Sequence, residues 1–158
     1  GSSRDFKPLP HRCEPLGERA GLRWVNDSKA TNAGAALAAV KGVAADAVAE
    51  ASLVLIAGGR GKGDDYQPLV DELARCGRAL VAMGETADEL IAALRDRLPV
   101  ERVADMRAAV SAATSLAKAG DTVLLAPAAA SFDQYRSFEH RGDCFRECVM
   151  TLEGGRHD

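Results

Sequence analysis

The chain alternates between two hydrophobic patterns, short continuous apolar runs and stretches with apolar residues at helical spacing. A run such as 52–57 (Ser-Leu-Val-Leu-Ile-Ala) is typical of a strand that is buried on both faces of a sheet. Thr86 with Glu89 three residues later predicts a capping box at the start of a helix. We expect strands at 52–57, 78–83, 100–103 and 122–126, and helices at 31–43, 68–76, 86–98, 106–119 and 138–152.

The first part of the chain has a different pattern. Residues 12–16 and 22–26 flank a connection at 17–21 that begins and ends with glycine, which predicts an antiparallel hairpin. After it, strands alternate with helices, which predicts βαβ units with helices on both faces of the sheet. The sequence therefore predicts an α/β fold, a doubly wound, mostly parallel, Rossmann-like sheet of about six strands with an N-terminal hairpin.

One domain accounts for most of the chain. A chain of 158 residues can bury a core without disulfides or a structural metal. We interpret residues 1–3 as a scar left by expression cloning, and residues 4–10, which include two prolines, as the remnant of an interdomain linker. Residues 11–158 are then a single domain.

Charge and composition exclude several classes of partner. The formal net charge is −3, which gives no overall field that attracts nucleic acid. No apolar run reaches the roughly 18 residues that span a bilayer, and the start of the chain has no export signal pattern. The four cysteines are scattered, as in proteins with reduced thiols. We expect a cytoplasmic protein that binds neither nucleic acid nor membranes.

Three connections that follow predicted strands carry small or polar residues, at 26–32, 58–63 and 127–134. Ligands of open α/β sheets bind beyond the carboxyl ends of the strands. Lys29 stands beside hydroxyl residues at a predicted helix N-terminus, a combination that suits a carboxylate or phosphate. Glycines at 58–63 let the backbone approach an anion that Arg60 and Lys62 attract. We therefore expect an anion-binding site.

Each connection also has a purely structural interpretation. The polar residues at 26–32 are those that cap helices, and the glycines at 58–63 suit a flexible turn. The glycine segment is neither a Walker A loop, because Ile56 and Gly63 replace required residues, nor a Gly-x-Gly-x-x-Gly fingerprint.

Nucleophilic and metal chemistry are disfavoured. Ser131 lacks the flanking glycines of a nucleophile elbow. His140, Cys144 and Cys148 share one helix face, but two helical turns separate the outer two, so we interpret them as ordinary core or surface residues. We expect no metal site in the chain.

Together the motifs resemble the C-terminal domain of the Mur ligase family, and within it the type that adds glutamate. The resemblance runs through 9–12 (Leu-Pro-His-Arg), 24–32 (Trp-Val-Asn-Asp-Ser-Lys-Ala-Thr-Asn), 58–62 (Gly-Gly-Arg-Gly-Lys), 127–135 (Pro-Ala-Ala-Ala-Ser-Phe-Asp-Gln-Tyr) and 138–142 (Phe-Glu-His-Arg-Gly).

The resemblance implies an ATP-dependent ligase of peptidoglycan precursor synthesis. In that reaction ATP phosphorylates the carboxylate of UDP-MurNAc-L-alanine, and the amine of glutamate, expected to be D-glutamate, attacks the acyl phosphate. In enzymes of this family three domains close around the reactants. The N-terminal domain binds the UDP-sugar, and the central domain carries the P-loop and most Mg²⁺ ligands. We expect these two domains as partners, ATP and Mg²⁺ as cofactors, and no activity from this domain alone.

The resemblance also implies roles for particular residues. The glutamate pocket would consist of Thr31, Lys62, Ser131, Phe132 and Phe138. The ATP side would consist of Arg12, Asp27 and Lys29. Lys29 and Lys62 would contribute to catalysis by positioning and charge stabilisation.

Alternative interpretations remain at this point. One is a Mur-type domain for L-glutamate, since the residues do not reveal the handedness of the substrate. Another is a Mur-type domain for a different amino acid, which different chemistry at Lys62 and Ser131 would indicate. A free-standing nucleotide-binding module is the third alternative.

Overall fold

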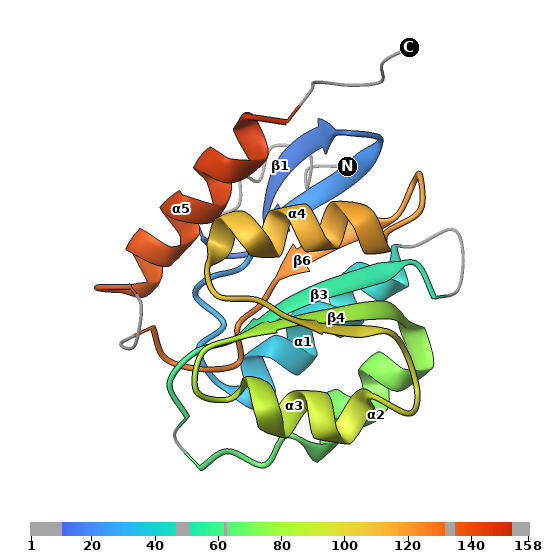
Figure 1. The fold of residues 1–158 in the computed structure, drawn as a ribbon, viewed down its shortest axis with the longest axis vertical. Coiled ribbons are helices and arrows are strands. Elements are labelled where there is room, and N and C mark those ends of the chain that lie inside the picture. Colours follow the sequence, from blue (N-terminus) through green and yellow to red (C-terminus); the bar gives the residue numbers. More distant parts are fainter. Residues whose placement is uncertain (1–10, 47–50, 62, 132–134, 153–158) are drawn as a thin grey trace, which may run out of the picture.

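A computed structural model describes residues 11–46, 51–61, 63–131 and 135–152 and shows a sheet between two layers of helices (Figure 1). The strands are β1 (Glu14–Arg19), β2 (Leu22–Asn26), β3 (Leu53–Gly58), β4 (Gly77–Met83), β5 (Val100–Arg102) and β6 (Thr122–Leu125). The helices are α1 (Ala33–Ala45), α2 (Gln67–Cys76), α3 (Ala87–Leu94), α4 (Met106–Leu116) and α5 (Phe138–Met150).

The sheet has the strand order β1-β2-β6-β3-β4-β5, and every neighbouring pair except β1 with β2 is parallel. Helices α1, α2 and α3 pack on one face, whereas α4 and α5 pack on the other. This arrangement confirms the doubly wound, mostly parallel sheet with an N-terminal hairpin. Because β6 lies between β2 and β3, and the chain leaves β2 and β6 toward opposite faces, the order of the sheet reverses there. Such a reversal is where open α/β sheets bind ligands.

The central strand β3 explains the continuous apolar run in the sequence. Leu53, Leu55 and Ala57 join the core beneath α1, α2 and α3, whereas Val54 and Ile56 join the core beneath α4 and α5. Successive side chains of a strand point to opposite faces, and here both faces are covered. An apolar residue is therefore favoured at every position.

The hairpin differs from the expected boundaries. Strand β1 runs through Glu14–Arg19 instead of 12–16, with an irregularity between Pro15 and Gly17. The turn consists of Ala20 and Gly21, which both have positive φ, 56° and 77°. Type I′ turns require this conformation at both central residues. Alanine is uncommon at a turn position with positive φ, so the sequence predicted a five-residue connection at 17–21 instead of this two-residue turn.

Several helix ends also differ. Helix α1 begins at Ala33 instead of residue 31, because Asn32 is the N-cap and its side chain accepts a hydrogen bond from the Ala35 N–H at 2.8 Å. Helix α4 ends at Leu116 instead of residue 119. The capping box predicted for α3 is wrong, because the Thr86 side chain makes no capping hydrogen bond and the helix spans only Ala87–Leu94.

Gly42 lies in the exposed part of α1 and offers a test of local stability. A Cβ added at Gly42 meets nothing within 4 Å. Gly42→Ala is therefore expected to raise the free energy of unfolding by about 0.5–1 kcal/mol, because alanine loses less backbone entropy in a helix. Urea unfolding followed by circular dichroism measures the change. Gly120→Ala is the control, since its surroundings are equally open but its φ of +89° makes alanine destabilising; stabilisation by both variants would contradict this account.

Candidate functional site

The loops that follow β2, β6 and β3 meet at one edge of the sheet, as the sequence predicted. Ala128 donates a backbone hydrogen bond to the Ala30 oxygen at 2.9 Å, which joins the β6 loop to the β2 loop. Arg60 donates to the Ala130 oxygen at 2.8 Å, and Ala130 donates to the Arg60 oxygen at 3.1 Å. The three polar connections of the sequence therefore form one continuous surface.

The buried guanidinium of Arg141 holds these loops together. Arg141 is 1% exposed and comes from the first turn of α5. It donates to the Ser28 hydroxyl at 3.2 Å and to the Ala129 oxygen at 3.0 Å. A Cβ added at Gly59 would lie 3.0 Å from its Nη1, so the β3 loop packs against it as well. The Ser28 hydroxyl in turn donates to the Phe138 oxygen at 2.7 Å, which fixes the start of α5.

The structure brings the three expected ATP residues together around one hollow of about 380 Å³. Arg12 and Lys29 are exposed cations that line it, and the buried Asp27 is its carboxylate. The rest of the lining is Cys13 and a strip of alanines, Ala30, Ala35, Ala38 and Ala39. Small side chains at helical spacing make a flat apolar wall, which suits a planar base. The hollow thus combines an apolar wall, one carboxylate and two cations.

Asp27 is the buried acid of this hollow. Its side chain accepts a hydrogen bond from the Cys13 thiol at 3.5 Å, and its backbone N–H donates to the Leu125 oxygen at 2.8 Å. Burial raises the pKa of Asp27 above its ordinary value. Burial also raises the pKa of Cys13 to about 11, and the Asp27 charge adds to this, so the thiol stays protonated and able to donate. A carboxylate accepts several hydrogen bonds, so Asp27 retains capacity for the hydroxyls of a ligand.

Of the expected glutamate residues that the structure describes, Thr31 and Phe138 adjoin the lining of this hollow, through Ala30 in the chain and through Lys29 in space. Thr31 follows directly on the β2 loop and is half-buried, and Ser131 is 5% exposed at the end of the β6 loop. The ring of Phe138 lies under the Lys29 ammonium, with Nζ 4.8 Å from the ring centroid. Lys29 therefore links the expected ATP and glutamate sides. Lys62 and Phe132 lie outside the described residues. The roles of all the expected site residues remain predictions.

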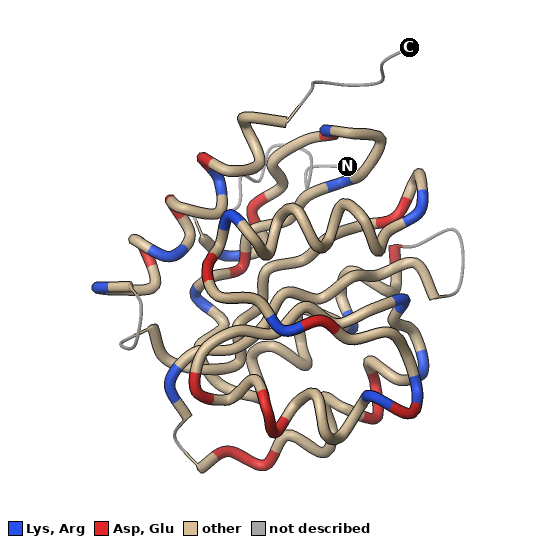
Figure 2. Tube along the Cα trace, viewed as in Figure 1, with Lys and Arg blue, Asp and Glu red and all other residues tan. Residues whose placement is uncertain are grey.

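No group of three or more potential metal ligands gathers among the described residues. Figure 2 shows acidic and basic residues interspersed along the chain, without a large region of one sign in this view. Within the described ranges, no helix is long and apolar enough to cross a membrane.

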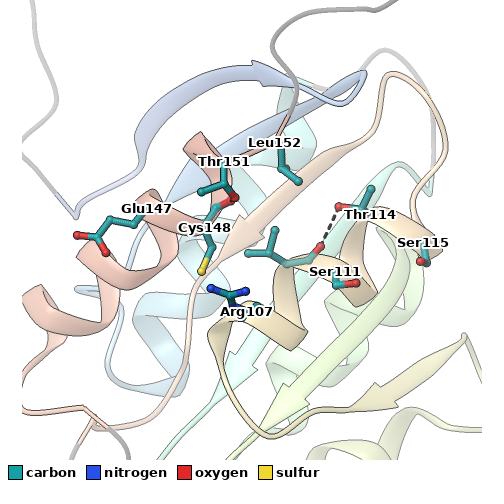
Figure 3. A pocket seen from close by; sticks show the side chains of 9 residues that line it. Arg107, Ser111, Thr114, Ser115, Glu147, Cys148, Thr151 and Leu152 are labelled. Carbon is teal, nitrogen blue, oxygen red and sulfur yellow. Dashed lines mark hydrogen bonds between the residues drawn. The ribbon is translucent and has the colours of Figure 1, made fainter.

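A larger hollow of about 540 Å³ lies elsewhere, between α4 and α5 (Figure 3). Its charged lining residues are Arg107 and Glu147, one from each helix, and the Cys148 thiol lies close to Arg107 in this view. None of the residues expected to bind ATP or glutamate lines it. We therefore place the candidate site at the strand ends and not in this larger hollow.

The family of the chain follows from its sequence match. The family described as "Mur ligase, glutamate ligase domain" matches residues 11–129. The chain belongs to the Mur ligase family. The match covers the β2 and β3 loops and the first part of the β6 loop, so the ATP side of the candidate site lies within the matched region, whereas Ser131, Phe132 and Phe138 follow it.

Curated Mur ligase relatives are close in sequence. A UDP-N-acetylmuramoylalanine--D-glutamate ligase from Chromohalobacter salexigens is 51% identical over 146 residues, which cover 92% of this chain and 32% of the relative. The enzyme of the same name from Nitrosococcus oceani is 51% identical over 93% of this chain and 32% of its own. The chain therefore spans about a third of the length of these relatives.

Solved structures share the fold at low sequence identity. A murein peptide ligase from Psychrobacter arcticus aligns with a TM-score of 0.68 at 14% identity, over 97% of this chain and 32% of that one. A folylpolyglutamate synthase from Thermotoga maritima aligns with a TM-score of 0.62 at 18% identity, over 94% of this chain and 32% of that one. At such identities the likeness establishes the fold of the Mur ligase domain and nothing beyond it.

Proposed function

We propose that the chain acts as the C-terminal domain of an ATP-dependent ligase that joins D-glutamate to UDP-MurNAc-L-alanine in the cytoplasm. The observation that carries the proposal is the hollow formed by Arg12, Asp27 and Lys29, whose Lys29 also reaches the expected glutamate side at Phe138. The names of relatives at 51% identity support D-glutamate as the amino acid.

In this reaction the domain would position the reactants and stabilise charge. In the proposed reaction ATP transfers its terminal phosphoryl group to the alanine carboxylate, and ADP leaves. The glutamate amine then attacks the acyl carbon, a tetrahedral intermediate forms, and phosphate leaves as the amide bond closes. Each intermediate is anionic, so cations at fixed places stabilise it. Lys29 stands where the phosphate side and the amino-acid side meet and would stabilise that charge.

The ATP hollow has a feature for each part of the nucleotide. The α1 alanines Ala35, Ala38 and Ala39 would face the base. The Asp27 carboxylate would accept hydrogen bonds from ribose hydroxyls, and Arg12 would pair with phosphate. Thr31, Lys62, Ser131, Phe132 and Phe138 would hold glutamate. This set supplies hydroxyl groups, an ammonium and backbone N–H groups, which suit the two carboxylates of glutamate.

The remaining parts of the active site would come from other domains. We propose that a P-loop, the Mg²⁺ ligands and the UDP-sugar site belong to preceding domains of the same enzyme, joined to this one through residues 4–10. This division agrees with a chain that spans about a third of its relatives' length. The domain alone would then be inactive.

Separate substitutions on the two sides of the site test the proposal. In the full ligase, Asp27→Asn is expected to raise KM for ATP about 10–100-fold, since a hydrogen bond to a charged group contributes about 1.5–3 kcal/mol. Ser131→Ala is expected to raise KM for D-glutamate instead. Steady-state kinetics with each substrate varied in turn measure both effects.

The control for these variants is Asp96→Asn, which changes an exposed carboxylate far along the chain from both sides of the site. Its kinetics should match those of the wild type. A rise in KM for D-glutamate alone in Asp27→Asn, or unchanged KM for ATP, would contradict the assignment of the hollow.

A further inference from the structure

We propose that Thr86 is a positioning residue for glutamate binding, which holds the glycine-rich loop after β3 in its binding shape. The inference rests on the proposed function, because it deepens the role of that loop. Thr86 follows β4, a strand that contributes none of the residues expected in the site.

Thr86 and Gly59 are joined by a reciprocal pair of hydrogen bonds. The Thr86 hydroxyl accepts from the Gly59 N–H at 3.2 Å, and the Thr86 N–H donates to the Gly59 oxygen at 3.1 Å. Thr86 is 4% exposed, so both bonds are shielded from water. The side chain and backbone of one residue thus satisfy both polar backbone groups of Gly59.

The Thr86 side chain is diverted from the role that its position favours. It precedes the first residue of α3, where a threonine hydroxyl ordinarily accepts from a backbone N–H of the helix. Here Thr86 has φ −85° and ψ 0° and makes no capping hydrogen bond. Helix α3 therefore lacks a stabilising side-chain cap, because the Thr86 hydroxyl bonds the β3 loop instead. We infer that the contact with the loop has a function of its own.

Glu85, the residue before Thr86, also holds the β3 loop, at Gly61. The Glu85 carboxylate accepts from the Gly61 N–H at 2.8 Å. A Cβ added at Gly61 would lie 3.2 Å from the Thr86 methyl group, so the backbone there packs against Thr86. On its other side the loop pairs with the β6 loop through Arg60 and Ala130. The loop is therefore held from both neighbouring strands.

Positioning matters here because the loop is rich in glycine. Glycine has the largest backbone freedom to lose, so an unrestrained loop must be ordered when a ligand binds. A loop that is already ordered binds more tightly, because that entropy is lost during folding instead. Thr86 therefore acts on glutamate affinity through the backbone of Gly59 and Gly61, without touching glutamate itself.

The test compares Thr86→Val with Thr86→Ser in the full ligase. Valine keeps the shape but removes the hydroxyl, so KM for D-glutamate should rise about 5–10-fold while KM for ATP stays within about twofold. Serine keeps the hydroxyl and should restore KM for D-glutamate. Thr114→Val is the matched control, because the Thr114 hydroxyl also makes a hydrogen bond to the backbone, in this case by donating to the Val110 oxygen at 2.8 Å within α4.

Amide hydrogen exchange on this chain gives an independent readout. Thr86→Val should speed exchange at Gly59 and Gly61, and Thr114→Val should leave both amides unchanged. Faster exchange together with a higher KM for D-glutamate supports the proposal.

The outcomes separate this proposal from the proposed function. A wild-type ligase that adds no D-glutamate would contradict the proposed function. An active wild type with unchanged KM for D-glutamate in Thr86→Val would overturn the positioning role, even if the variant melts at a lower temperature. If Thr86→Val does not fold, Thr86→Ala replaces it, and failure of both to fold also overturns the proposal, because Thr86 would then be only structural.

Discussion

Arg141→Met is expected to lower the free energy of unfolding by about 3–5 kcal/mol and to remove most ligase activity. Arg141 is 1% exposed, and its guanidinium donates to the hydroxyl and backbone oxygen of Ser28 and to the Ala129 oxygen. Methionine fills a similar volume but leaves these buried acceptors without the donors of Arg141. Because they belong to the β2 and β6 loops, the loss should separate the two loops that carry Lys29 and Ser131. Urea unfolding gives the stability, and single-turnover kinetics give the activity.

Arg146→Met is the matched control in the same helix. The Arg146 side chain is 34% exposed, and its guanidinium contacts the Glu14 carboxylate at 2.8 Å. Ion pairs at this exposure contribute about 0–1 kcal/mol, so a small loss of stability is expected. Equal losses in the two variants would contradict a special role for the buried guanidinium.

Gly58→Ala is expected to destabilise the domain by more than about 3 kcal/mol, because it combines backbone strain with overpacking. Gly58 has φ +120°, and an added Cβ would overlap the backbone oxygen of Met83 in the adjacent strand β4. Relief requires β3 and β4 to move apart where the glycine-rich loop begins. We therefore also expect a higher KM for D-glutamate. Thermal unfolding and the ligase assay measure the two effects.

Gly63→Ala provides the comparison for Gly58. Gly63 also has a positive φ of +80°, but an added Cβ meets nothing within 4 Å. Only the strain of about 1–2 kcal/mol should remain. A loss in Gly63→Ala as large as in Gly58→Ala would show that strain, and not the close approach of β4, makes Gly58 necessary.

The layered fold was predictable because its signals are local. The apolar run of β3 and the helical spacing of 106–119 each reflect the surfaces that an element buries. The errors lie where distant contacts decide. Ala20 takes a left-handed φ of 56° in a turn, which local preference disfavours. The Thr86 hydroxyl accepts a hydrogen bond from the Gly59 N–H, which is distant in sequence, instead of capping α3.

The candidate site was predictable in part for the same reason. Strand ends with small or polar residues are visible in the sequence, and the parallel order of β2, β6 and β3 brings them together. Arg141 belongs to the 138–142 motif of the resemblance but was not assigned a role, because its neighbours in sequence do not show that its guanidinium is buried. Its importance comes from Ser28, which reaches it only through the fold. The roles of all the expected ATP and glutamate residues stay predictions.

The most direct test of the proposed function is the amino-acid dependence of the ligase that contains this domain. Purified enzyme receives ATP, Mg²⁺ and UDP-MurNAc-L-alanine with D-glutamate, with L-glutamate or with no amino acid, and mass spectrometry identifies the product while phosphate release is measured. We predict one phosphate released for each D-glutamate joined, and at least about 100-fold lower kcat/KM for L-glutamate. Preference for L-glutamate or another amino acid, or no amide product with D-glutamate, would contradict the account.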